Sequence, residues 1–161
     1  MFSLFSYKRG IEMELVKVGE KTYFIKNPTN VGVYKIDENN VYLIDTGNDK
    51  DAGKKILKII DTQGWNVKGI ISTHSNADHI GGNKFIQDRT GCPVYVYGME
   101  KCFTEYPFME PSFLFGAFPF KDLRNKFLLA KESVVTDINN NLPEGLEYFS
   151  LKGHFFDMIG I

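Results

Sequence analysis

Residues 72–83 read STHSNADHIGGN, and the rest of the chain is arranged around this stretch. Two of the three histidines of the chain, His74 and His79, lie in it with Asp78 between them. The residues just before it, 67–72, are short, apolar and rich in β-branched side chains, which predicts a buried strand. The cluster therefore follows a strand, at the point where open α/β sheets place their chemistry.

A helical pattern follows the cluster. Residues 80–88 carry apolar side chains at helical spacing, and Asp78 is expected to cap this helix and to complement its dipole. Imidazole nitrogens and carboxylate oxygens are ordinary ligands of zinc and iron, so the cluster indicates a divalent metal site. A histidine near a strand end is also commonly only packed or solvated. From the cluster alone, the two interpretations are about equally supported.

The pattern resembles the signature of the metallo-β-lactamase superfamily, His-x-His-x-Asp-His. Three residues match it: His74, Asp78 and His79. Asn76 stands in place of the second histidine, and the glycines at residues 81–82 also look like the family. The third histidine, His154, follows a strand-like segment where the family carries its next ligand. All three histidines of the chain therefore fall on ligand positions.

The resemblance implies a set of ligands for two ions: His74, Asn76 and His154 for the first, Asp78 and His79 for the second. It also implies a catalytic role for Asp78, which would orient the attacking hydroxide. Zinc is the expected metal, with iron or manganese as alternatives.

Asp45 opens an Asp-Thr-Gly sequence at the end of a predicted strand. On local chemistry alone, a plain turn is the favoured interpretation, because Asp and Gly are common turn formers. In the superfamily, an Asp-x-Gly at this place supports the metal loop. The resemblance therefore implies that Asp45 orients a ligand through a hydrogen bond without binding the metal itself.

Length and composition indicate one globular domain, residues 1–161. A net charge of −1, with acidic and basic residues mixed along the chain, argues against a nucleic-acid partner. No apolar stretch reaches the roughly eighteen residues of a membrane span, so no membrane association is expected. Cys92 and Cys102 are too few for a disulfide framework, which favours a cytoplasmic location.

The remaining pattern predicts a mixed α/β fold. Strands are expected at residues 13–18, 22–25, 31–37, 41–44, 94–97, 132–138 and 146–151, and a helix at 52–63. The first four strands form an antiparallel meander, and strands alternate with helices after it. This order indicates an α/β sandwich with a mixed sheet and flanking helices.

An aromatic-rich segment spans about residues 99–130. Eight of the twenty-five residues 103–127 are aromatic, and three prolines interrupt any long helix. Packing on the sheet and an insertion that folds over the metal loop are about equally supported. In the second case its rings line a substrate pocket or a dimer surface: Tyr106, Phe108, Phe113, Phe115 or Phe118.

The chain departs from the family in two respects. Asn76 offers a neutral amide oxygen, a poorer zinc donor than imidazole. Family members continue after the position of His154 with a strand that carries a bridging aspartate and with a last histidine, and neither is found here. We therefore expect a partial αββα sandwich that lacks its carboxy-terminal portion, and a fragment of a longer protein in preference to a natural short form.

Two functions follow from this pattern. The first is a metal-dependent hydrolase acting on a small-molecule ester, thioester, lactam or phosphoester, with weak or no activity in this short chain. The alternative is a non-catalytic binding or assembly module that keeps the fold with an incomplete metal site. A half sandwich also leaves apolar surface uncovered, which predicts a homodimer.

Overall fold

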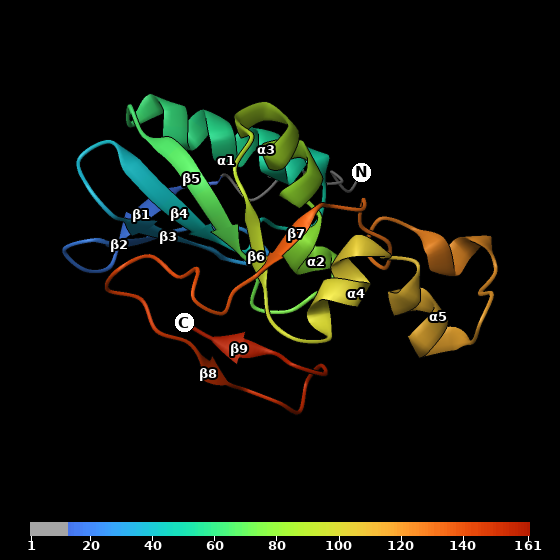
Figure 1. Ribbon diagram of the computed structural model, residues 1–161. Helices are drawn as coiled ribbons and strands as arrows, with labels where there is room; N and C mark the ends of the chain where they lie inside the picture. Colours follow the sequence, from blue (N-terminus) through green and yellow to red (C-terminus); the bar gives the residue numbers. More distant parts are fainter. Residues whose placement is uncertain (1–12) are drawn as a thin grey trace, which may run out of the picture.

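A seven-stranded mixed sheet forms the centre of the computed structural model, which describes residues 13–161 (Figure 1). Its strands run in sequence order: β1 (Leu15–Lys17), β2 (Thr22–Ile25), β3 (Val31–Lys35), β4 (Asn40–Ile44), β5 (Asn66–Ile71), β6 (Val94–Val96) and β7 (Val135–Asp137). Neighbours are antiparallel from β1 to β4 and parallel from β4 to β7. The predicted mixed α/β fold is therefore confirmed, while the predicted domain limits of 1–161 stay a prediction.

Two helices cover one face of this sheet: α1 (Lys50–Thr62) and α3 (Asn83–Thr90) (Figure 1). Their buried side chains pack with alternate residues of the central strands into the larger core. The helix α1 begins two residues before its predicted start, because Asp49 caps it by accepting a hydrogen bond of 2.9 Å from the Ala52 amide.

The prediction of one helix over residues 80–88 is wrong. The chain forms a short helix α2 (Ala77–Ile80), then Gly81 and Gly82, and then α3. A Cβ atom on Gly81 would lie 2.2 Å from the carbonyl carbon of Asn48. The break therefore lets the chain pass directly over the loop that precedes α1, which only glycine permits.

The capping role predicted for Asp78 is also wrong. The N-cap residue of α2 is Asn76, and Asp78 lies within the first helical turn. Its carboxylate accepts a hydrogen bond of 2.9 Å from the hydroxyl of Thr29. A carboxylate in the first turn still complements the helix dipole, so that part of the expectation agrees with the structure.

A small second sheet lies against the other face of the large one. It consists of β8 (Phe149–Ser150) and β9 (Ile159–Gly160), which pair antiparallel. A second core of Ile71, Ile138 and Ile159 joins the two sheets. The strand predicted over residues 146–151 is thus much shorter than expected, and β9 was not predicted. The small sheet therefore covers part of the face of the large sheet that was expected to lie uncovered.

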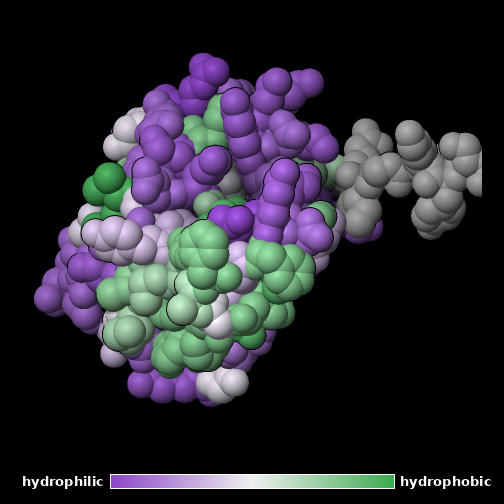
Figure 2. Space-filling view, turned by 90° about the vertical axis from the view of Figure 1, so that its right-hand side faces the viewer, coloured by the Kyte–Doolittle hydropathy of each residue, from purple (hydrophilic) through white to green (hydrophobic). Residues whose placement is uncertain are grey.

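The aromatic-rich segment forms α4 (Glu100–Glu105), α5 (Met109–Phe115) and the 3-10 helix η1 (Lys121–Arg124). Apolar side chains gather on the face of the molecule that α5 presents (Figure 2). The exposed large ones in this segment include Met109, Phe113, Leu114, Phe115, Phe118, Phe120 and Phe127. Among residues 13–161, no helix has the length and apolar character needed to cross a membrane.

Candidate metal centre

The three histidines come together in space. The ring of His74 lies 3.9 Å from that of His79 and 5.1 Å from that of His154, measured between centroids. His154 arrives from the turn between β8 and β9, and the Ile159 amide of β9 donates to the carbonyl of Thr73 at 2.9 Å. The small sheet is therefore tied directly to the loop that carries His74.

Asp45 is buried at the end of β4 and accepts three hydrogen bonds. Its Oδ1 accepts from the Thr73 amide at 2.8 Å, and its Oδ2 accepts from the Thr73 hydroxyl at 2.8 Å. Oδ2 also lies 2.7 Å from Nδ1 of His79. Asp45 has a φ of 63°, a left-handed conformation that is costly for a residue other than glycine. This strained backbone places the carboxylate of Asp45 where it reaches both Thr73 and His79.

This network assigns the protons on two imidazoles. A carboxylate only accepts, so His79 donates from Nδ1 to Asp45, and its neutral ring has its lone pair on Nε2. The Thr73 hydroxyl gives its hydrogen to Asp45, so it accepts from Nδ1 of His74 at 3.0 Å. Nε2 of His74 is then a lone-pair acceptor, and it is buried without a hydrogen-bond partner among residues 13–161.

Burial and charge set the protonation of these rings. Burial, together with the neighbouring His79 and His154, lowers the pKa of His74 to about 4, so its ring is neutral at neutral pH. Burial also lowers the pKa of His79, but the hydrogen bond and charge of Asp45 and the nearby acids outweigh it and raise the pKa overall. The neutral ring of His74 is the form that binds metals.

The other predicted ligands lie around these rings. Oδ2 of Asp78 is 3.8 Å from Nε2 of His79. The side-chain amide of Asn76 donates to Oε1 of Glu110 at 2.8 Å, while its Oδ1 is buried without a partner in the described part of the chain. Two of the predicted ligands, His74 and Asn76, therefore each present an unpaired acceptor atom.

Two buried carboxylates near the site have no counterpart in the sequence-based prediction. Glu100 of α4 accepts from the amide and hydroxyl of Ser75, at 2.9 and 2.5 Å, and from the Asp157 amide at 2.8 Å. It joins the loop after His74 to the loop after His154. Its presence in an apolar, aromatic segment was the only available signal. Burial raises its pKa.

Glu110 of α5 is the second of these carboxylates. Besides Asn76, it accepts a hydrogen bond of 2.9 Å from the amide of Ala77, the first residue of α2. It thereby supplies the cap that α2 lacks from its own side chains. Burial raises the pKa of Glu110 to about 7, against the lowering effect of its two hydrogen bonds.

These residues fit a metal in part. The unpaired acceptors on His74 and Asn76 suit a cation, because a buried acceptor without a donor is costly. Within residues 13–161, however, no group of three or more His, Cys, Asp or Glu side chains has the arrangement of a metal site. An asparagine oxygen lies outside that set, so the site as it stands depends on a ligand type that is unusual for zinc.

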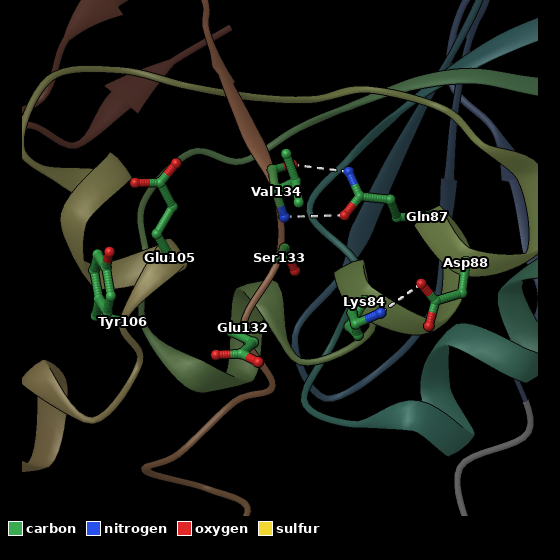
Figure 3. A pocket seen from close by; sticks show the side chains of 8 residues that line it. All are labelled: Lys84, Gln87, Asp88, Glu105, Tyr106, Glu132, Ser133 and Val134. Carbon is green, nitrogen blue, oxygen red and sulfur yellow. Dashed lines mark hydrogen bonds and ion pairs between the residues drawn. The ribbon is translucent and has the colours of Figure 1, made fainter.

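Surface hollows do not all coincide with this centre. A hollow of about 230 Å³ is lined by His154, Gly153 and three phenylalanines, of which Phe113 is the one predicted pocket residue. A larger hollow of about 530 Å³ lies between α3, the end of α4 and residues 132–134 (Figure 3). None of the predicted metal ligands lines the larger hollow, so size alone does not locate the site.

Comparison with known proteins decides the family. The model of the metallo-beta-lactamase superfamily matches residues 25–154, most of the chain. The chain belongs to the metallo-β-lactamase superfamily. Membership in this superfamily implies binding of a divalent metal, and it agrees with the convergence of the three histidines described above.

Two curated relatives are hydroxyacylglutathione hydrolases. The enzyme of Methylococcus capsulatus is 32% identical over 66 residues, which cover 37% of this chain and 26% of that protein. The enzyme of Erythrobacter litoralis is 44% identical over 46 residues, covering 29% of this chain and 18% of that protein. This superfamily member therefore spans only about a quarter or less of each relative in these matches.

Solved structures share the fold. The subclass B3 metallo-beta-lactamase BJP-1 of Bradyrhizobium japonicum aligns with a TM-score of 0.62 at 22% identity, over 86% of this chain and 48% of that one. The BLEG-1 B3 metallo-beta-lactamase aligns with a TM-score of 0.60 at 20% identity, over 92% of this chain and 65% of that one. At this identity the likeness concerns the fold alone.

Proposed function

We propose that this chain is the histidine-bearing part of a metal-dependent hydrolase. The observation that carries the proposal is the Nε2 of His74, which is buried and unpaired among residues 13–161, in a neutral ring beside the rings of His79 and His154. A structural histidine would spend both ring nitrogens on hydrogen bonds. Asp45 also orients these rings: it accepts from Nδ1 of His79 directly, and it reaches His74 through Thr73. Metal-binding histidines are normally held by a hydrogen bond of this kind on the nitrogen that does not face the metal.

We assign the metal to His74, Asn76 and His154, with Asp78 and His79 next to them. The metal is zinc in the first instance, with iron or manganese as alternatives. A divalent ion here supplies Lewis acidity, which polarises a carbonyl or phosphoryl oxygen and lowers the pKa of water. The protein contributes fixed ring orientations through Asp45.

Asp78 is proposed as the catalytic residue. Its side chain is 47% exposed, so it is open to solvent and to a substrate, and one of its oxygens is held by Thr29. The carboxylate would align an attacking water and accept its proton. Among the five predicted ligands, Asp78 is the only acid.

The substrate is proposed to be a small molecule with a thioester, ester, lactam or phosphoester bond. The two relatives named hydroxyacylglutathione hydrolase favour the thioester among these. The cytoplasmic location and the homodimer stay predictions. The exposed apolar side chains on α5 and on the residues that flank η1 support the homodimer, which would cover that surface.

The second candidate is a non-catalytic module that keeps the fold. It is favoured by Asn76 in the place of a histidine and by the lack of a three-ligand arrangement of His, Cys, Asp or Glu within the described residues. Because both candidates share the fold, only metal uptake and turnover can distinguish them.

Metal content and hydrolysis separate the two candidates. The purified chain is stripped with a chelator, dialysed against zinc, iron or manganese, and analysed for metal per chain, with His74→Ala as the control. Near-stoichiometric uptake that His74→Ala abolishes, with turnover of a thioester or ester panel, supports the hydrolase. Uptake without turnover still agrees with the hydrolase, because this short chain is expected to have weak or no activity, whereas no uptake refutes the metal centre and favours the module.

A further inference from the structure

Asn76 occupies the N-cap position of α2 but does not cap it. An asparagine at this position normally accepts a hydrogen bond from the helix through its side-chain oxygen. Here Oδ1 makes no such bond and is buried without a partner among residues 13–161. The helix instead receives its cap from Glu110, which accepts from the Ala77 amide at 2.9 Å.

The orientation of the Asn76 amide follows from the same contact. Oε1 of Glu110 accepts from Nδ2 of Asn76 at 2.8 Å, while its Oε2 accepts from the Ala77 amide. The amide nitrogen must therefore face Glu110, and the amide oxygen must face away from it. The carboxylate fixes the side chain with its oxygen as the free atom.

The free Oδ1 of Asn76 is one of two unpaired acceptors in this loop. Nε2 of His74, two residues earlier in the same loop, is also buried without a partner in the described chain. Two buried lone pairs without a donor suit a cation, whereas an anion or a carbonyl group would be repelled by both. Asn76 and His74 thus each offer a free lone pair to a cation.

We propose that Glu110 is a positioning residue that makes Asn76 a metal ligand, by holding its amide so that Oδ1 coordinates in the place of a missing imidazole. The proposal rests on the proposed metal centre. Glu110 acts here as Asp45 acts on His79: each accepts from the nitrogen of a side chain whose other polar atom is left for the ion.

The test uses Glu110→Gln on the full chain, with zinc affinity measured by isothermal titration calorimetry and the spectrum of bound cobalt recorded. The glutamine oxygen can still cap Ala77, but its NH2 group then faces Asn76 and turns that amide around. We expect zinc affinity to fall roughly 10- to 100-fold, with a changed cobalt spectrum. The exposed Glu132→Gln is the matched control and should leave both unchanged.

A rescue separates orientation from general damage. In the double variant Asn76→Asp with Glu110→Gln, the glutamine NH2 donates to one aspartate oxygen and the other oxygen is free again. We expect it to recover the zinc affinity of the parent chain, and Asn76→Ala alone to lose as much affinity as Glu110→Gln.

The outcomes distinguish this inference from the proposed function. A parent chain that binds no zinc overturns both. A parent chain that binds zinc, while Glu110→Gln or Asn76→Ala binds it equally well, overturns the role of Glu110 and leaves the metal centre in place. If Glu110→Gln does not fold by circular dichroism, the Asn76→Ala measurement still decides, because unchanged zinc affinity in that variant overturns the inference.

Discussion

Replacing Glu100 by glutamine tests whether the two loops that carry His74 and His154 are held by one buried carboxylate. Glu100 is fully buried, and its two oxygens serve different loops. One oxygen accepts from the Ser75 amide and hydroxyl, and the other accepts from the Asp157 amide at 2.8 Å. In Glu100→Gln, one oxygen becomes an NH2 group, so one backbone amide must face another donor.

The magnitude follows from the cost of that lost acceptor. A buried donor left unpaired costs about 1–3 kcal/mol, and for a chain of this length each kcal/mol shifts the unfolding midpoint by roughly 2–4 °C. We therefore expect Glu100→Gln to lower the midpoint by about 2–12 °C. Removal of a buried negative charge, whose burial raises the pKa of Glu100, offsets part of this loss.

The assay is thermal unfolding followed by circular dichroism in chelator-treated buffer, so that metal does not contribute. Glu105→Gln is the control, since Glu105 lies on the same helix and its side chain makes no hydrogen bond among the described residues. Zinc affinity should also fall in Glu100→Gln, because the two histidine loops are no longer held together. An unfolding midpoint equal to that of the parent chain would refute this reasoning.

Three further predictions concern the same region. Asp45→Asn should weaken zinc binding roughly 10- to 100-fold in calorimetry, because His79 loses its charged acceptor; unchanged affinity would contradict that role. Gly81→Ala should lower the free energy of unfolding in urea by at least about 3 kcal/mol through its backbone clash, whereas Gly91→Ala meets no atom within 4 Å and should cost only about 1–2 kcal/mol of left-handed strain. The pKa of Glu110, raised from 4.5 to about 7, means that its neutral form stabilises the fold below pH 4.5 and that this stability is lost as the pH rises to about 7. Relative to Glu110→Gln, the free energy of unfolding of the metal-free parent in urea should fall by up to about 1.4 kcal/mol per pH unit between pH 4.5 and about 7. If the two proteins instead show parallel curves of unfolding free energy against pH, the raised pKa of Glu110 is contradicted.

Local patterns were sufficient for much of the fold. The alternation of buried residues along β4 and the apolar side of α1 are properties of neighbouring residues, and the predicted elements there agree with the structure to within two residues. The strand before residues 72–83 was likewise identified from its own spacing, whereas the single helix predicted over residues 80–88 was wrong. The resemblance to the family indicated the candidate ligands, and the rings of His74, His79 and His154 do lie together in the structure.

Contacts between distant residues were beyond such patterns. Glu100 bonds to Asp157, 57 residues away, and Glu110 bonds to Asn76, 34 residues away. Nothing in the local sequence distinguishes these two acids from solvated ones, because burial is decided only when α4 and α5 pack against the loop. The break at Gly81 depends in the same way on the loop that it crosses. The sequence by itself determined the strands of the large sheet, the helix α1 and the candidate ligands, whereas only the tertiary structure decided which buried acids hold the loops of those ligands in place.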